Sequence, residues 1–289
     1  MIVGARGEVG SALCASFESL GHTTISVSSA QPVSPDGHCI DFALAEQVIG
    51  RGEVDLLINA SGRGDRRASV RSGREATQAL AGHVSEAGVP AVLISTTRVL
   101  EGYEGQASED SPPRPTTEYA RANAENEEAW LRQTHGQGSV LRIANFFTTP
   151  LHAESPQVQL LPWSLLTEAV ACSSIQVRSG PSATKEFVSA LDAAQAALTI
   201  CRQGWTGRTV STNPGCPMTL RELAEAAAGA VEMIGKARPT MSFGADTDPF
   251  QLAPPGALVA AGWKATLSLA EVQLAMQQWL MAGMGHEID

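Results

Sequence analysis

The most constraining feature of this sequence is a glycine triplet at its start, Gly4, Gly7 and Gly10, with the spacing G-x-x-G-x-x-G. A short apolar strand, Met1–Val3, precedes it, and a helical pattern follows with apolar residues at Val9, Leu13, Phe17 and Leu20. Gly4 allows a tight turn, Gly7 lets backbone N–H groups approach a phosphate, and Gly10 lets the helix pack against the strand. An ordinary glycine-rich turn is the alternative, but a dinucleotide-binding motif requires this strand–turn–helix context.

Apolar runs alternate with helical patterns along the first half of the chain. We expect strands near residues 23–27, 38–42, 54–59, 91–95 and 139–144, with helices between them. This alternation predicts an α/β fold with a Rossmann-type, doubly wound parallel sheet that carries helices on both faces.

Beyond residue 146 the pattern becomes less regular. We therefore predict a dinucleotide-binding domain over residues 1–146 and a smaller C-terminal substrate-binding lobe over most of 147–289. A segment at about 185–212 is expected to return to the first domain. Capping-box pairs begin two late helices, Thr219 with Glu222 and Ser268 with Glu271. Residues 237–265, rich in proline and glycine, have no assignment.

Composition restricts the partners. A formal net charge of −10 argues against nucleic acid, whose binding surfaces are basic. No apolar run approaches the roughly 18 residues of a membrane span, and no signal peptide is visible. The five cysteines lack C-x-x-C spacing and the six histidines form no ligand-like pair. We therefore expect a cytoplasmic protein with reduced thiols, without nucleic-acid or membrane partners and without a metal.

The cofactor turn and the ends of the next strands indicate which dinucleotide to expect. No acidic residue follows the second strand to bind the ribose hydroxyls of NAD, whereas Arg6 between the first two glycines can contact the extra phosphate of NADP. NADP is therefore favoured and NAD is the alternative; a solvated turn is the other reading of Arg6. Asp41 with Phe42 is expected near the adenine, although Asp41 can equally cap the next helix. Small residues against the cofactor are Ala60, Ser61 and Gly62.

Two hydroxyl-bearing residues can supply the chemistry. Thr96 comes directly at the end of the strand 91–95, and Tyr119 begins a helix that runs to about residue 132. They can converge on one carbonyl or carbinol oxygen, with Tyr119 as general acid or base and Thr96 holding the oxygen. A packing role is the alternative for Tyr119.

Four segments together resemble the extended short-chain dehydrogenase/reductase superfamily, in particular its NAD-dependent epimerase/dehydratase group. They are the turn 4–12, which includes Arg6, Glu8 and Val9; Asn59–Gly62; the run from Ser95 through Pro115 to Tyr119; and Leu141–Asn145 with the later 185–192. The resemblance looks closest to 4-keto-sugar-nucleotide reductases such as dTDP-4-dehydrorhamnose reductase and GDP-fucose synthase. It implies catalytic roles for Thr96 and Tyr119, a place for Asn145 near the cofactor, a sugar-nucleotide substrate and a homodimer.

One departure from that family's pattern concerns the chemistry directly. Its tyrosine belongs to Y-x-x-x-K, but the residue four after Tyr119 is Asn123. Asn123 can bond the nicotinamide ribose but carries no charge to lower the pKa of the tyrosine. We expect an NADPH-dependent reductase of a nucleotide-activated keto-sugar or similar small molecule. The alternatives are a non-catalytic NADP-binding or regulatory protein and a sugar-nucleotide epimerase.

Overall fold

The computed structural model describes residues 1–27, 39–61, 79–150, 156–213, 216–245, 251–253 and 256–283. The chain divides into two compact units. The first consists of Met1–Phe146, Ala190–Pro214 and Phe250–Ala265, and the second of Phe147–Ser189, Gly215–Pro249 and Thr266–Asp289. Each unit is thus assembled from three separate stretches of sequence.

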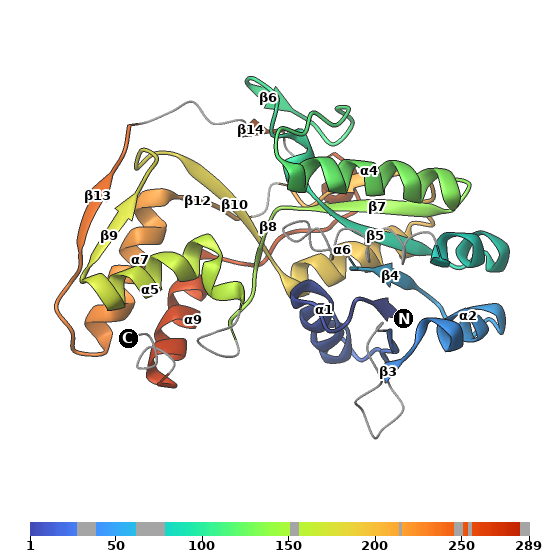
Figure 1. Cartoon of the computed structure of the whole chain (residues 1–289), viewed down its shortest axis with the longest axis horizontal. Helices are drawn as coiled ribbons and strands as arrows, with labels where there is room; N and C mark the ends of the chain where they lie inside the picture. Colours follow the sequence, from blue (N-terminus) through green and yellow to red (C-terminus); the bar gives the residue numbers. More distant parts are fainter. Residues whose placement is uncertain are drawn as a thin grey trace. The chain divides into compact units, whose positions relative to one another are not determined.

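A seven-stranded sheet organises the first unit (Figure 1). Its strands are β1 (Ile2–Val3), β2 (Ser26–Val27), β3 (Cys39–Ile40), β4 (Leu57–Asn59), β5 (Ala91–Thr96), β7 (Gly138–Ile143) and β11 (Thr209–Ser211). They lie in the order β11-β7-β5-β4-β1-β2-β3, and every neighbouring pair is parallel. The predicted doubly wound parallel sheet is confirmed.

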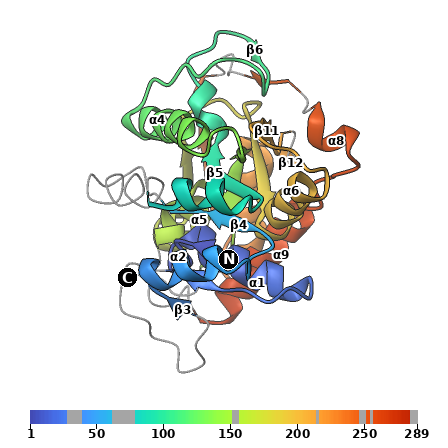
Figure 2. The ribbon, with the colours of Figure 1, turned by 90° about the vertical axis from the view of Figure 1, so that its right-hand side faces the viewer.

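Helices flank this sheet. They are α1 (Glu8–Ser19), α2 (Phe42–Gly50), the helical residues 79–87, α4 (Glu118–Gln133) and α6 (Ala190–Arg202). Leu57, Leu93 and Val140 pack in one cluster with residues of α2 and α4, whereas their neighbours Ile58, Val92 and Leu141 are buried outside it. Because successive side chains of a strand point to opposite faces, both faces are covered. Figure 2 shows α2 and α4 on one side and α1 with α6 on the other.

Three strands are shorter than the apolar runs that predict them: β2 and β4 begin later, and β3 is shorter at both ends. Two-residue β1 pairs with Ser26–Val27 on one side and Ile58–Asn59 on the other, so the ladders are equally short. Phe42, expected from its apolar run to lie in the third strand, is instead the first residue of α2. The reason is local: Asp41 caps this helix and ends the strand before it.

The first unit also contains short elements that the sequence pattern did not predict. They are the 3₁₀ helix η1 (Thr97–Leu100), the parallel pair β6 (Gln106–Ala107) and β14 (Gln251–Leu252), and the short helix α8 (Ala257–Ala260). Leu258 is buried, and the indole N–H of Trp263 donates to the Asp192 carbonyl at 3.0 Å. A few buried side chains thus hold the described residues between 251 and 265 in this unit without a periodic pattern.

The second unit is a helical layer with small sheets. Its elements are β8 (Asn145–Phe147), which carries the chain into it, η2 (Pro156–Gln159), α5 (Leu161–Cys172), β9 (Ser174–Val177), β10 (Thr184–Ser189), β12 (Cys216–Thr219), α7 (Leu220–Met233), β13 (Thr240–Phe243) and α9 (Leu269–Met281). The strands form the sheets β12-β10-β8 and β13-β9. Both predicted capping boxes, at the starts of α7 and α9, are confirmed.

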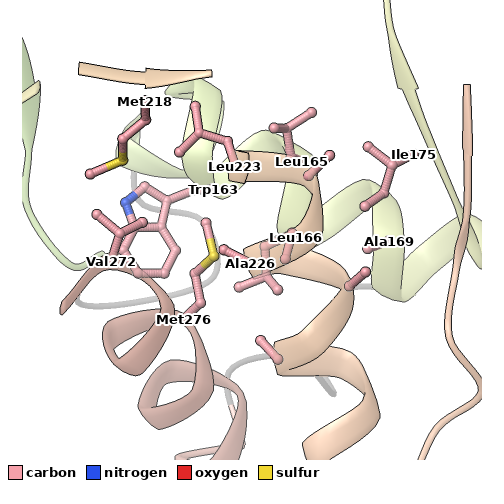
Figure 3. Packing of buried hydrophobic residues seen from close by; sticks show 14 of the residues in the cluster. Trp163, Leu165, Leu166, Ala169, Ile175, Met218, Leu223, Ala226, Val272 and Met276 are labelled. Atoms are coloured by element: carbon pink, nitrogen blue, oxygen red, sulfur yellow. The ribbon is translucent and has the colours of Figure 1, made fainter. Parts of the chain in front are cut away.

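Helices α5, α7 and α9 enclose the core of the second unit (Figure 3). Trp163 is fully buried at its centre, stacked on Phe147 with ring centroids 5.6 Å apart and tilted against Trp279 at 5.8 Å. The indole N–H of Trp279 donates to the Pro150 carbonyl at 3.1 Å. No helix in the described part of the chain has the length and apolar character needed to cross a membrane.

Candidate functional site

The candidate residues of the first unit gather at the carboxyl edge of its sheet. From β1 the chain adds β2 and β3 on one side and β4, β5, β7 and β11 on the other, so the strand order reverses between β1 and β4. Open α/β sheets bind ligands in the crevice outside the strand ends at such a reversal. The predicted glycine turn follows β1, Ala60 and Ser61 follow β4, and Thr96 ends β5.

The glycine turn meets the end of β4 at van der Waals distance. Gly4 has φ +78°, and a Cβ there would lie 2.9 Å from the Ala60 carbonyl and from Ser61 Cα. A Cβ on Gly10 would lie 2.2 Å from the Gly4 carbonyl oxygen. Both positions therefore require glycine, and α1 begins directly against the turn.

The start of α1 is suited to an anion. Gly7 is its N-cap and provides no side-chain acceptor for the first turn. A helix start without such an acceptor offers backbone N–H groups and the positive end of the helix dipole. Arg6 is exposed beside it, while Glu8 and Val9 are half-buried in the first turn. These features fit the pyrophosphate of a dinucleotide, and the carboxylate of Glu8 is the one acidic group among them.

Asn59 shapes the end of β4. It is fully buried, and its Oδ1 accepts hydrogen bonds from the Ser61 N–H at 3.0 Å and the Ser61 hydroxyl at 2.5 Å. This turn holds Ala60 and Ser61 against Gly4. Asn59 was not among the predicted site residues, although an asparagine after a buried strand is a known turn signal. The predicted Gly62 lies outside the described residues.

Asp41 and Phe42 follow β3. Asp41 Oδ1 accepts the Leu44 N–H at 2.8 Å and so caps α2, one of the two roles that the sequence allows. The Phe42 side chain packs against the core cluster. The ring is only partly buried, and the expected adenine contact of both residues stays a prediction.

Ser95 and Thr96 at the end of β5 serve different purposes. The Ser95 hydroxyl donates to Glu127 at 2.5 Å inside the protein. Thr96 Oγ1 accepts the Arg98 N–H at 3.2 Å and so begins η1. Because Thr96 Oγ1 acts as an acceptor there, its own hydrogen is the group that can donate onward.

Tyr119 is the second residue of α4, whose N-cap Thr117 accepts the Ala120 N–H at 3.3 Å. The phenol is half-buried. One turn further on, the Asn123 amide donates to the Tyr119 carbonyl at 2.9 Å. Arg98 connects this turn with Thr96, since its guanidinium carbon lies 5.5 Å from the centroid of the Tyr119 ring. The structure thus brings Thr96, Tyr119 and Asn123 into one region.

Glu101 joins η1 to the start of α4, a role that sequence reasoning missed. One carboxylate oxygen accepts four hydrogen bonds, from the N–H and hydroxyl groups of Thr116 and Thr117, at 2.7–3.3 Å. The other accepts from Arg98 Nε at 3.1 Å. Burial by itself raises the pKa of Glu101, but the hydrogen bonds from the two threonines and the charge of Arg98 outweigh it and lower the pKa to about 2.

A buried ion pair connects α4 to β7 of the sheet. Arg142 of β7 and Glu127 of α4 have side chains that are each 4% exposed, with Nη2 and Oε2 2.8 Å apart. Arg142 also donates to the Glu109 carbonyl at 3.1 Å. Arg142 is therefore a structural residue, although the motif that contains it predicts the vicinity of the cofactor. Asn145, the predicted cofactor contact, is exposed at the start of β8.

Comparisons with known proteins agree with this architecture. The model of the NAD dependent epimerase/dehydratase family matches residues 1–211. Among curated proteins, no sequence matches this chain.

Solved structures extend the likeness to nearly the whole chain. MoeE5 in complex with UDP-glucose and NAD is 18% identical, with a TM-score of 0.72 and 98% of each chain covered. UDP-glucose 4-epimerase of Thermotoga maritima with UDP-glucose is 13% identical, with a TM-score of 0.73 and 98% of each chain covered. DesIV, a dTDP-glucose 4,6-dehydratase from Streptomyces venezuelae with NAD bound, is 18% identical, with a TM-score of 0.74, 100% of this chain and 99% of that chain covered. At these identities the likeness shows the fold.

Proposed function

Because the chain belongs to the NAD-dependent epimerase/dehydratase family, we propose that it is an NADPH-dependent reductase of a keto group on a nucleotide-activated sugar or a similar small molecule. The observation that carries the proposal is the carboxyl edge of the sheet. There the glycine turn contacts the end of β4, and Thr96 and Tyr119 follow on β5 and α4. Neighbours of this fold bind UDP-glucose or NAD, which supports a sugar nucleotide as the substrate class.

The glycine turn and the start of α1 would hold the cofactor. Backbone N–H groups after Gly7 would bind the pyrophosphate, and Ala60 and Ser61 would line its path across β4. Arg6 is exposed at this turn and would contact the extra phosphate of NADP. When bound, the nicotinamide would supply a hydride to the substrate carbonyl carbon.

Residues of this chain would supply the proton that the reduction needs. Reduction leaves the former carbonyl oxygen with the electron pair of the broken π bond, and this oxygen needs one proton to become a hydroxyl. Tyr119 would donate that proton from its phenol, and Thr96 would donate a hydrogen bond to the same oxygen. Water would afterwards return a proton to Tyr119.

Asn123 favours a second candidate, a protein that binds NADP without catalysis. Its amide donates to the Tyr119 carbonyl, and it brings no positive charge to the phenol. Reduction requires a protonated tyrosine, so a reductase tolerates this residue better than an epimerase, which must first oxidise its substrate. The retained Thr96 and Tyr119 favour the reductase over the binding protein.

Titration of the protein with NADPH and NADH, followed by nicotinamide fluorescence, tests the cofactor assignment. We expect tighter binding of NADPH, and roughly tenfold weaker NADPH binding in Arg6→Ala, because one charge-assisted hydrogen bond is lost. NADH binding should not change. Arg51→Ala, at the C-terminal end of α2, is the matched control. If neither dinucleotide binds, the proposal is wrong.

Turnover distinguishes the two candidates. The wild type should oxidise NADPH in the presence of a 4-keto-sugar nucleotide, and Tyr119→Phe should lose this activity while still binding NADPH. Tight NADPH binding without turnover in both the wild type and Asn123→Lys would support the binding protein instead.

A further inference from the structure

Arg98 lies at the phenol that the proposed reaction uses, yet the proposed mechanism gives it no role. Its guanidinium carbon is 5.5 Å from the centroid of the Tyr119 ring. At this distance a cation and an aromatic face attract one another. The side chain is 50% exposed, so core packing does not explain its position.

Two contacts determine where this guanidinium lies. The Arg98 backbone N–H donates to Thr96 Oγ1 at 3.2 Å, which fixes the start of η1. Its Nε and Nη2 each lie 3.1 Å from one Glu101 oxygen. The other Glu101 oxygen is held by Thr116 and Thr117, immediately before α4. The same carboxylate therefore positions both the guanidinium and the helix turn that carries Tyr119.

We propose that Arg98 is a positioning residue that supplies positive charge to the phenol of Tyr119, and that Glu101 holds it there. The inference rests on the proposed role of Tyr119 as proton donor. Asn123 is uncharged at the position one helical turn away. A guanidinium also keeps its charge over the whole range in which a phenol titrates, which an ammonium does not.

The other charged groups of the packed elements have their own partners or are exposed. On η1, Glu101 opposes the charge of Arg98 and reduces its effect. On α4, Arg121 donates to the Thr116 carbonyl at 2.8 Å, and Glu118 is exposed. Glu127 of α4 and Arg142 of β7 neutralise one another in a buried ion pair. A moderate net effect of Arg98 is therefore expected.

The test measures the titration of Tyr119 directly. The chain has two tyrosines, Tyr103 and Tyr119, so labelling with [¹³Cζ]tyrosine gives two NMR resonances, which Tyr103→Phe assigns. Arg98→Gln should raise the pKa of Tyr119 by roughly half a unit to one unit, from Coulomb's law at this distance near the surface. Arg98→Lys should retain only part of the effect, because an ammonium loses its charge within the range in which the phenol titrates. Arg98→Met, which keeps an apolar stem on the ring, should reproduce the shift if Arg98→Gln fails to fold.

Matched variants separate charge from structure. Arg114 lies over the other tyrosine, Tyr103, at 4.3 Å, so Arg114→Gln should leave the Tyr119 resonance unchanged. Adding Asn123→Lys to Arg98→Gln should restore the lower pKa. An unmoved Tyr119 pKa in both Arg98→Gln and Arg98→Met overturns the inference.

The measurement needs neither cofactor nor substrate, so its failure differs from that of the proposed function. In an active enzyme, Arg98→Gln should also move the alkaline limb of kcat/KM for reduction upward by the same amount, since the protonated phenol then persists to higher pH. If Arg98→Gln turns over substrate but the alkaline limb of its kcat/KM profile does not move, the role of Arg98 is wrong and the assignment as a reductase stands. A titration shift without NADPH binding overturns the reductase and leaves the charge assignment intact.

Discussion

Among the described glycines of the first unit, Gly10 leaves the least room for a Cβ atom. A Cβ there would approach the Gly4 carbonyl oxygen to 2.2 Å, so either α1 or the turn must move. We expect Gly10→Ala to lower the free energy of unfolding by about 1–3 kcal/mol, the usual cost of overpacking. The same movement should weaken NADPH binding. Urea unfolding and fluorescence titration measure the two effects.

Gly82 provides the matched control for this change. It lies in the helical stretch 79–87, and among the described residues a Cβ there would meet no atom outside its own helix backbone within 4 Å. Gly82→Ala should therefore stabilise the protein by up to about 1 kcal/mol, since alanine favours a helix interior. Equal effects at the two glycines would contradict the close contact between α1 and the turn.

Glu101 should make stability depend on pH in the acid range. Its pKa is lowered from 4.5 to about 2 in the folded chain, so between these values the unfolded chain binds the proton more readily. The stabilisation by Glu101 is therefore complete above about pH 4.5 and is lost as the pH falls toward 2. We expect Glu101→Gln to unfold at lower urea concentration than the wild type at pH 7, and the difference to shrink below pH 4.5.

A control for Glu101 lies three residues further on. Glu104 is exposed on the same loop, and Glu104→Gln should change the free energy of unfolding by no more than about 0.5 kcal/mol at any of these pH values. A wild-type-to-Glu101→Gln difference that persists unchanged at pH 2.5 would show that packing, not charge, is responsible.

At the scale of elements, the pair Glu127–Arg142 holds α4 on β7 and thereby places the first turn with Tyr119. Removing one partner leaves a buried charge without compensation. Glu127→Ala should therefore lower the free energy of unfolding by about 3–5 kcal/mol. The double replacement Glu127→Leu with Arg142→Met should lower the free energy of unfolding far less than Glu127→Leu and Arg142→Met, each made singly, do in sum. A urea-based double-mutant cycle measures the coupling, and additive losses would contradict it.

The sequence predicts the elements better than their connections. Period and caps correctly indicate the parallel sheet, α4 and the two capping boxes, because these depend on neighbours in the chain. The contacts of Glu101 with Thr116 and Thr117, and of Glu127 with Arg142, join residues 15 positions apart or more, and no local pattern encodes them. Residues 250–265 illustrate the same limit. Buried Leu258 and the hydrogen bond of Trp263 assign them to the first unit, while proline and glycine obscure any periodicity.

At the scale of the whole molecule, the first unit is not a continuous segment. Its sheet needs β11 at one edge, paired with β7 from Thr209 to Ser211. The helix layer that contains α1 also needs α6, which contacts α1 and β7. Ala193, Ala194 and Ala197 of α6 are fully buried. A fragment of residues 1–146 lacks both, so it would expose an apolar sheet face and an unpaired edge of β7.

We therefore expect the 1–146 fragment to show no cooperative thermal transition by circular dichroism and poor dispersion of its amide NMR signals. A matched fragment that joins 190–214 and 250–265 to it through flexible glycine–serine linkers should recover a cooperative transition, since it restores β11, α6 and α8. Recovery should include NADPH binding, because the glycine turn, Ala60 and Ser61 all belong to this unit. If the 1–146 fragment instead unfolds cooperatively with the same thermal midpoint as the longer fragment, segments 190–214 and 250–265 are not needed to complete the core of the unit.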